Sequence, residues 1–539
     1  MSDALRSSGA RHLFGRFVAA TFVVFLHFAP EISSYQNVRN RFFRQWSLND
    51  AISLTLDIFV LGTLITLVVQ ALDRPQWPRV RGVIRALFVL AIVSGIVANI
   101  EILHRPHFLS FEILWLLMAG AVGYSLAKPQ SRVVRFAYKL SLVFSPLIPI
   151  VLIQMFMWST WGAPHRPLRV SFPTGPSRPV FVFVFDEWSF VRSAPGGEFR
   201  STLPHLRELA ERSLFFRNAQ SPGDDTYRAL PLLLYGDHPL DHLPRVFNKI
   251  GKRGREYVTS SRPPQRVESI FSVARSAGYN TALIGFYLPY ESMFRDSVDF
   301  GRGYSFYPVT SSLWRRMLLD ALEALRYETD PISRHLFRIL YAKVFTRNWL
   351  RLHERMGSGI EDAVDKMPKN TLTFVHYPLP HAPFIWNEDG TFRGVYPIDW
   401  HRTSAEMDGA LGTEEEYQRQ LVYFDKVVGE LMDRLRKEGK YDDALIVLTS
   451  DHSWRFDPDS KLANGARRWV PLIVKLPGQT RGCVIDTPIS NIRYQGFVRH
   501  VLRGDADDPE IEAILRQCAE STSGRIDAPP GSGRASGLP

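Results

Sequence analysis

The chain has 539 residues, which is more than one ordinary domain holds, and its apolar fraction of 45% is not extreme. The formal net charge is +11, but much of the positive excess lies in short loops between apolar runs, so no nucleic-acid partner is expected. The two cysteines, Cys483 and Cys518, form no CxxC motif. A disulfide framework is therefore excluded, and a single bridge between the two is possible but not expected.

Long apolar runs dominate the first 160 residues, and five of them are long enough to span a bilayer, which takes about 20 apolar residues. They begin near Leu13, Ala51, Gly82, Phe108 and Phe136. Their close succession favours membrane spans over buried core helices. The arginines before the first run are typical of a signal peptide, but no small-residue cleavage site follows, so this run is expected to remain as a helix.

The basic residues of the loops predict the orientation of these spans. The N-terminal segment and the second and fourth loops are basic, whereas the first loop, with Arg39, Arg41 and Arg44, argues the other way. The majority places the N-terminus in the cytoplasm. Five spans then put everything after Trp161 outside a bacterial-type cytoplasmic (inner) membrane, in a multi-pass arrangement.

Three acids, Asp57, Glu101 and Glu112, lie within the apolar runs, near the predicted outer ends of their helices. Acids inside a membrane are costly and often functional. We expect them either to find partners among the helices or interfacial water, or to line the place where a cationic lipid headgroup enters.

The rest of the chain has the pattern of an α/β domain. The run "VFVFVF" (180–185) is typical of a strand buried on both faces, and similar runs at 279–287, 370–377 and 444–450 are separated by helical patterns. This alternation predicts a mostly parallel sheet flanked by helices. The predicted organisation is a cytoplasmic segment (1–12), a five-helix transmembrane domain (13–160), a linker (161–178), the α/β domain (179–503) and a partly disordered tail (504–539).

Residues 311–355 form a basic, aromatic-rich helical stretch inside the α/β domain. Two interpretations stay open. The stretch either covers the sheet, or rests as a surface helix on lipid headgroups.

Chemically active side chains follow the predicted strands, where sites form in open α/β sheets. Asp186 and Glu187 follow the first strand, and Asp451 and His452 follow the last, while His381 lies just beyond the third. Carboxylate oxygens and imidazole nitrogens suit zinc, and carboxylates also suit manganese or magnesium. The strand ends therefore predict a divalent metal site, with zinc as the first choice.

Five segments occur in the order seen in the sulfatase and alkaline phosphatase superfamily, which the chain resembles: "FVFVFDE", "TYRALPLLLYG", "SAGYNTALIG", "PLPHAPF" and "YDDALIVLTSDHS". The similarity is greatest to the membrane-anchored branch of phosphoethanolamine transferases and lipoteichoic acid synthase-like enzymes. That branch joins five membrane helices to an extracytoplasmic catalytic domain. The resemblance covers nearly the whole chain, from about residue 13 to about residue 503.

The resemblance also indicates the nucleophile. Sulfatases carry Cys or Ser in a C/S-x-P-x-R motif, with a Gly ten residues after the nucleophile. Gly236 corresponds to that Gly, so Thr226 falls on the nucleophile position. A Thr cannot become the formylglycine of sulfatases, and the motif's Pro and Arg are missing. Because phospho-alcohol transferases of the group use Thr, sulfate esters are disfavoured.

The resemblance implies a mechanism in which a divalent ion lowers the pKa of the Thr226 hydroxyl. The expected ligands are Asp186 or Glu187, Asp451, His452 and Thr226 itself. Thr226 would attack a lipid phosphodiester, diacylglycerol would leave, and an acceptor hydroxyl would take the headgroup phosphate. His381 corresponds to the family's substrate-contacting His. Four further candidates for binding phosphate are Arg228, Lys461, Arg467 and Arg468.

The sequence thus predicts a membrane-bound transferase that moves a phosphoethanolamine or phosphoglycerol group from a phospholipid donor to an envelope glycan or lipid. A monomer is expected. The alternatives are a hydrolase of phosphate or sulfate esters from the same superfamily, and a non-catalytic binding protein that keeps the fold.

Overall fold

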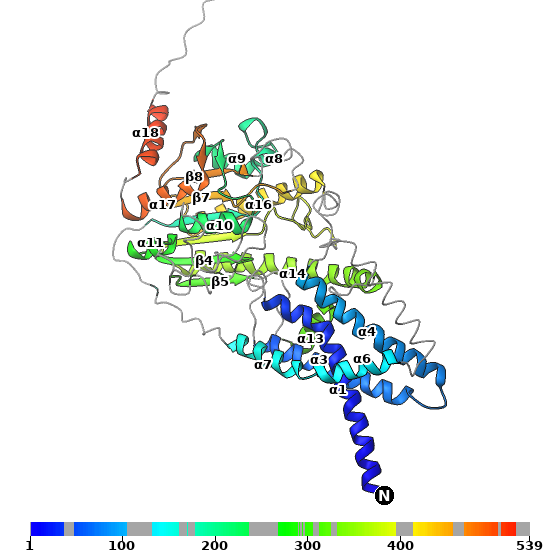
Figure 1. The fold of residues 1–539 in the computed structure, drawn as a ribbon. Helices are drawn as coiled ribbons and strands as arrows, with labels where there is room; N and C mark the ends of the chain where they lie inside the picture. Colours follow the sequence, from blue (N-terminus) through cyan, green and yellow to red (C-terminus); the bar gives the residue numbers. More distant parts are fainter. Residues whose placement is uncertain are drawn as a thin grey trace, which may run out of the picture. The chain divides into compact units, whose positions relative to one another are not determined.

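The chain folds into two compact units (Figure 1). In a computed structural model, the residues described are 2–36, 48–104, 132–160, 170, 178–236, 268–288, 290, 294, 297–304, 312–324, 331–394, 413–455, 468–504 and 508–523. The helical unit comprises residues 1–164 and 305–348, and the sheet unit comprises residues 165–304 and 349–539.

The helical unit is built from long helices with apolar contacts between them. They are α1 (Ser2–Gln36), α3 (Leu48–Leu72), α4 (Pro78–His104), α6 (Arg132–Phe144), α7 (Leu147–Thr160), α13 (Leu313–Ala324) and the first part of α14 (Pro331–Lys366). Phe25 and Phe28 of α1 pack with Leu54 and Ile58 of α3 and with Met155 of α7 in a buried cluster. Contacts of this kind hold neighbouring helices together by close packing.

Within the described ranges, three segments are long and apolar enough to cross a membrane: Ala10–Pro30, Leu48–Leu72 and Arg132–Met157. They correspond to the predicted runs that begin near Leu13, Ala51 and Phe136. The predicted count of five is not confirmed. The run near Gly82 forms α4, which is not among the three segments, and the run near Phe108 lies outside the described residues.

The acids predicted inside the membrane are only partly described. Asp57 is 4% exposed, and its Oδ2 has no hydrogen-bond partner among the residues with assigned structure. Glu101 lies on α4, but its side chain is not described, and Glu112 lies outside the described residues. Both interpretations of these acids stay predictions.

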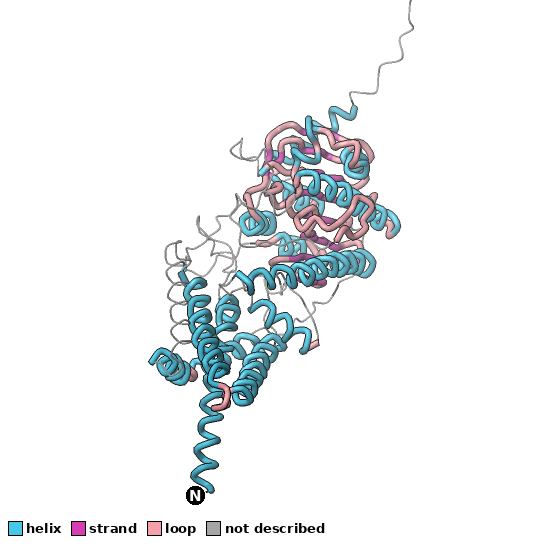
Figure 2. Tube along the Cα trace, turned by 90° about the vertical axis from the view of Figure 1, so that its right-hand side faces the viewer, coloured by secondary structure: helices cyan, strands magenta, loops and turns pink. Residues whose placement is uncertain are grey.

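The sheet unit has an eight-stranded sheet with helices on both faces, as Figure 2 shows. The strands in sheet order are β5 (Phe300–Tyr304), β4 (Asn280–Phe286), β6 (Thr371–Tyr377), β1 (Val180–Phe185), β7 (Leu445–Ser450), β8 (Leu472–Lys475), β2 (Leu214–Phe216) and β9 (Cys483–Ile485). The run from β5 to β7 is parallel throughout, and only β8 is antiparallel to its neighbours. The predicted mostly parallel α/β sheet is confirmed.

The alternation of side chains along β1 assigns the helices to the two faces. The other elements of the unit are α8 (Phe190–Ser193), η1 (Pro195–Gly197), α9 (Pro204–Ala210), α10 (Thr226–Tyr235), α11 (Ile270–Ser276), α16 (Glu414–Lys437), η6 (Asn491–Arg493), α17 (Tyr494–Arg503), α18 (Pro509–Ser523) and the short pair β3 (Ala219–Gln220) and β10 (Ile489–Ser490). Val180, Val182 and Val184 share a core with α10, α11 and α17. On the other face, the Phe185 ring lies 4.6 Å from that of Phe424 on α16, between ring centroids.

The segment between β5 and β6 leaves the sheet unit and returns. Its residues 305–348 belong to the helical unit, where α13 packs against α3 and α1, and α14 re-enters the sheet unit at Trp349. The interpretation that the whole stretch covers the sheet is therefore wrong for α13, although Trp349 does pack on Phe286 of β4. Sequence alone did not show this because an amphipathic pattern does not say which surface receives the helix.

The carboxyl-terminal part of the chain departs from one expectation and contains a further helix, α18. Cys483 of β9 and Cys518 of α18 form a disulfide, so the expectation that they stay unbridged is wrong. The folded part also continues past residue 503, because Ile511 and Ile514 of α18 are buried in the sheet-unit core. With Cys518 they form an apolar stripe on one face of α18, which docks the helix beside β9.

Candidate active site

The register of two central strands places the predicted acids side by side. β1 and β7 are parallel neighbours in which Phe185 pairs with Ser450. The next residues, Asp186 and Asp451, therefore emerge together at the carboxyl edge of the sheet. Both strands are fully buried, as their continuous apolar sequences predict.

Four of the predicted residues meet at this edge. Ligand atoms of Asp186, Asp451 and His452 all lie within 4.8 Å of one another. The Thr226 hydroxyl donates a hydrogen bond of 2.7 Å to Asp451 Oδ2 and lies 3.4 Å from His452 Nε2. All four side chains are buried, with at most 5% exposed. We call these four residues the catalytic cluster.

Hydrogen bonds fix the orientation of the two groups that follow β7. Asp451 Oδ1 accepts from the backbone N–H of His452 at 2.8 Å, so its other oxygen is left for Thr226. His452 Nδ1 lies 2.8 Å from the carbonyl oxygen of Ser453, and in this contact it must donate. The lone pair is therefore on Nε2, which lies 3.6 Å from Asp186 Oδ1 and from Asp451 Oδ2.

The cluster fits a divalent cation. Asp186 Oδ1 is buried and has no hydrogen-bond partner among the described residues. Burial raises the pKa of Asp186 well above its ordinary value, and the neighbouring Asp451 carboxylate raises it further. Two adjacent buried carboxylates are costly unless a positive charge lies between them. Two carboxylates, an imidazole nitrogen and a hydroxyl are suitable ligands for such an ion.

Thr226 is held at the first turn of α10. The side chain of Asp225 caps this helix by accepting from the backbone N–H of Arg228 at 2.9 Å. The loop before it packs closely, since a Cβ on Gly223 would lie 2.6 Å from the backbone nitrogen of Ala229. The N-terminus of a ten-residue helix thus points its free N–H groups and its dipole at the cluster, which favours an anionic group there.

Glu187 has a different role from that of its neighbour Asp186. It takes a left-handed backbone conformation, with φ of 63°, which costs a non-glycine residue about 1 kcal/mol or more. Its carboxylate pairs with the Arg455 guanidinium. Burial acts to raise the pKa of Glu187, but Arg455, together with His381 and His452, lowers it to about 2. Of the two acids predicted as alternative metal ligands, the geometry therefore groups Asp186, not Glu187, with Asp451 and His452.

His381 contacts the same guanidinium. An Arg455 Nη donates to His381 Nε2 at 2.8 Å, and His381 Nδ1 donates to the Ala382 carbonyl oxygen. Burial lowers the pKa of His381 to about 4, so the ring is neutral at pH 7. Gln420 of α16 holds the loop by donating to the His381 carbonyl oxygen at 2.9 Å.

Arg455 is the residue that the sequence analysis missed. It lies three residues after His452, and its side chain is 42% exposed while its partner Glu187 is fully buried. A basic residue so close to "SDH" was a usable signal. Arg455 and its partners Glu187 and His381, however, lie on three separate loops, and only the fold brings these together.

Two of the four predicted phosphate-binding residues, Arg228 and Arg468, lie within the described residues, and their predicted role stays a prediction. Arg228 forms a 2.6 Å ion pair with Asp224, and Arg468 is exposed. Lys461 and Arg467 lie outside the described residues. For these two as well, the prediction stays as it was.

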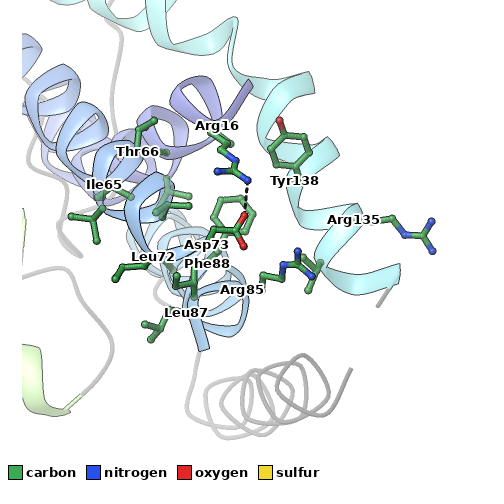
Figure 3. A pocket seen from close by; sticks show the side chains of 18 of the residues that line it. Arg16, Ile65, Thr66, Leu72, Asp73, Arg85, Leu87, Phe88, Arg135 and Tyr138 are labelled. Atoms are coloured by element: carbon green, nitrogen blue, oxygen red, sulfur yellow. Dashed lines mark hydrogen bonds and ion pairs between the residues drawn. The ribbon is translucent and has the colours of Figure 1, made fainter. Parts of the chain in front are cut away.

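A separate cavity of about 950 Å³ lies within the helical unit (Figure 3). Its walls are mostly apolar and come from α1, α3, α4 and α6. Arg16 pairs with Asp73 inside it at 2.5 Å, and Arg135 points away from it (Figure 3). No residue of the catalytic cluster lines this cavity, so it is not part of the candidate active site.

The fold and the cluster together define an α/β protein with a buried threonine hydroxyl beside a candidate metal centre. The chain belongs to the sulfatase family, since the family's sequence profile, described as "Sulfatase", matches residues 179–497. This family lies within the metal-dependent alkaline phosphatase and sulfatase superfamily. No curated protein has a significantly similar sequence.

Several solved structures have a similar arrangement. Phosphonate monoester hydrolase of Agrobacterium radiobacter is 14% identical, with a TM-score of 0.39 over 60% of this chain and 73% of that one. BT1596, a 2-O GAG sulfatase, is 14% identical, with a TM-score of 0.40 over 62% and 72%. A protein in the alkaline phosphatase superfamily from Vibrio parahaemolyticus is 15% identical, with a TM-score of 0.36 over 61% and 67%. Likenesses this distant say nothing of the substrate.

Proposed function

We propose that the protein is a phospho-alcohol transferase that moves a phosphoethanolamine or phosphoglycerol group from a phospholipid to an envelope glycan or lipid. The observation that carries the proposal is Thr226, a hydroxyl nucleophile hydrogen-bonded to Asp451 beside a candidate metal centre. A Thr side chain cannot be converted to the aldehyde of sulfatases, which favours a direct attack by its oxygen on phosphorus.

A divalent ion, with zinc as the first choice, would be held by Asp186, Asp451, His452 and Thr226. When bound, it would lower the pKa of the Thr226 hydroxyl and offset negative charge on the phosphate. The chain's own contribution is to hold Thr226 Oγ in place through Asp451 and to orient His452 Nε2 towards the cluster through the Nδ1 contact with the Ser453 carbonyl.

The reaction has two balanced halves. First, Thr226 Oγ forms a bond to phosphorus as the bond to the diacylglycerol oxygen breaks, and that oxygen takes up the proton that Thr226 loses. Second, an acceptor hydroxyl gives up its proton and attacks phosphorus. Thr226 then leaves and regains a proton. The N-terminus of α10 and the Arg455 guanidinium would stabilise the phosphate oxygens in both halves.

We also propose that the protein is a multi-pass protein of the cytoplasmic membrane, with its sheet unit outside. Support comes from contacts within the helical unit. Helix α13 follows β5 in the chain and reaches the beginning of α3, at Asp50 and Ser53. The basic loop with Arg74 and Arg81 lies at the opposite end of α3, and basic loops favour the cytoplasmic side. The Cys483–Cys518 disulfide is also typical of an oxidising compartment.

The test is the mass of the tryptic peptide 218–228, which contains Thr226, after incubation of the full chain with phosphatidylethanolamine or phosphatidylglycerol. We expect a headgroup-phosphate adduct that fragmentation localises to Thr226. The Thr226→Ala variant should show no adduct, and Thr226→Ser should retain one. Protein that contains its metal but forms no adduct with either lipid, even after rapid quenching, would overturn the transferase proposal in favour of hydrolysis.

A further inference from the structure

Helix α13 buries its charged side chains. Arg316 forms an ion pair of 2.5 Å with Asp50 of α3 and one of 3.2 Å with Asp320, one turn further along α13. Ser53 of α3 donates a 2.7 Å hydrogen bond to Asp320. Arg316 and Asp50 are each 6% exposed, and Asp320 and Ser53 are fully buried. We call these four residues the docking cluster.

The opposite side of α13 exposes large apolar side chains. Trp314 is 76% exposed and Leu318 is 71% exposed. These residues are one turn apart, and each lies two residues, or about 200° of helix rotation, before a member of the docking cluster. A helix in contact with water has the reverse arrangement, with apolar residues inside and charged residues outside. The exposed side of α13 therefore suits an apolar environment.

The first part of α14 also exposes apolar side chains. Leu336, Ile339 and Leu340 are 43–49% exposed at helical spacing. Lys343 and Arg347 are also exposed, and they extend the same stripe by two turns. An apolar stripe that continues into basic residues is typical of helices at the boundary between acyl chains and phosphate headgroups.

The contacts of α13 indicate that the apolar environment around its exposed side is a lipid bilayer. The helix packs against α3, a candidate membrane span whose Leu64, Leu67 and Val68 are 51–58% exposed. Its ion pair and hydrogen bond are made to Asp50 and Ser53, in the first two turns of α3. A helix fixed at that end of a span lies at the level where the hydrocarbon region of a bilayer meets the headgroups.

We propose that α13 and the start of α14 form a lipid-contact surface, which lies in the membrane interface with Trp314 and Leu318 among the acyl chains. The ligand class is a phospholipid bilayer, with lipid phosphates near Lys343 and Arg347. The sheet unit is thus attached to the membrane by a second segment, besides the linker that precedes β1. This proposal depends on the candidate spans and not on the transferase activity.

Site-directed spin labelling tests it directly. The only two cysteines are joined in the Cys483–Cys518 disulfide, so one introduced cysteine can be labelled selectively. The Leu318→Cys variant of the full chain is labelled and reconstituted in vesicles of phosphatidylethanolamine and phosphatidylglycerol. Leu67→Cys, on the exposed side of α3, provides the lipid control, and Asp433→Cys, 72% exposed on α16, provides the water control.

The readout compares collisions with oxygen, which concentrates in the bilayer, and with a water-soluble nickel complex. We expect the oxygen-to-nickel ratio at Leu318 to be several-fold above that at Asp433 and closer to that at Leu67. A ratio equal to that at Asp433 would place α13 in water and overturn the proposal. Low accessibility to both reagents would mean that protein covers the helix, which would also overturn it. A label at Trp314→Cys serves as the second variant.

Discussion

Two groups of buried acids in this molecule have opposite surroundings. In the docking cluster, Asp50 and Asp320 lie on either side of Arg316, and Ser53 supplies a further hydrogen bond. In the catalytic cluster, Asp186 and Asp451 lie beside each other, and the described residues place no arginine or lysine between them. The nearby Arg455 pairs with Glu187 instead.

The difference shows how structure separates a structural acid from a catalytic one. Buried carboxylates that are paired with a basic side chain hold two elements together. Buried carboxylates that converge without such a partner require an ion from solution or a proton. The catalytic cluster also contains a hydroxyl and an imidazole nitrogen with its lone pair inward, and the docking cluster has no imidazole. The first cluster is therefore the candidate metal site, and the second attaches α13 to α3.

The largest expected effect comes from the catalytic cluster. Asp451→Asn removes a proposed metal ligand and weakens the hydrogen bond to Thr226, so the proposed transfer activity should fall at least about 10³-fold. The matched control is Asp425→Asn, since Asp425 is equally buried in the sheet unit but accepts only from the backbone N–H groups of His205 and Leu206. The control should keep its activity per folded molecule. If Asp451→Asn and Asp425→Asn lost the same activity per folded molecule, Asp451 would have a structural role only.

Substitutions in the docking cluster should change the free energy of unfolding and not the catalytic rate. Arg316→Leu leaves Asp50 and Asp320 buried without their cation and should lower the free energy of unfolding by about 3–5 kcal/mol. Thermal unfolding in detergent measures this. The control is Arg434→Ala, which removes an exposed ion pair with Asp365 and should cost at most about 1 kcal/mol. If the two variants were equally stable, α13 would not be held by these charges.

Arg455 should have an intermediate effect that links charge to catalysis. Arg455→Ala should reduce the rate about 10²-fold, because a cation aimed at the phosphate is lost. It also leaves Glu187 buried and unpaired, so the protein should be less stable. Adding Glu187→Gln should restore stability without restoring the rate. The control is Arg419→Ala, which breaks an exposed ion pair with Glu415. If the variant that combines Arg455→Ala with Glu187→Gln recovered the rate of transfer, the proposed role of Arg455 would be contradicted.

The smallest predicted effect is a pH dependence of the sheet unit. His353 is 4% exposed, its two ring nitrogens have no hydrogen-bond partner among the described residues, and burial lowers its pKa to about 3. The unfolded chain takes up this proton near pH 6.5, so the stability that neutral His353 provides is complete above that pH. It is lost as the pH falls from about 6.5 towards 3.

Between pH 7.5 and pH 5, the His353→Phe variant should lose about 2 kcal/mol less stability than the unmodified protein. Urea titrations in detergent at the two pH values measure the difference. The same loss in the His353→Phe variant as in the unmodified protein would show that this ring is protonated in the folded state.

The sequence predicts the sheet and most of the cluster for one physical reason. A strand buried on both faces is a continuous apolar run, so the polar residue that ends it stands out, as Asp186 and Asp451 do. The prediction of Thr226 as a site residue needed two further signals, namely its spacing to Gly236 and the family resemblance. Nothing in the sequence shows that Glu187, next to Asp186, points to Arg455, because that depends on a left-handed residue and on the loop after β7.

In the helical parts, too, the sequence predicts the elements but not the contacts between them. The apolar and basic pattern of residues 311–355 predicts helices and allows two environments, but only the fold shows that Arg316 meets Asp50 across some 270 positions of sequence. Cys483 and Cys518 are 35 residues apart, and their bridge depends on where α18 packs. Local patterns predict elements, whereas contacts between distant segments decide the roles of single residues.

The most direct test of the distinction between the two clusters is the divalent-metal content of the purified full chain, measured by mass spectrometry of the elements. We predict a stoichiometric ion in the unmodified protein and in Asp320→Asn, and a strong loss of that ion in Asp186→Asn. Metal retained fully in Asp186→Asn, or lost equally in Asp320→Asn, would contradict the assignment of the metal centre to the catalytic cluster.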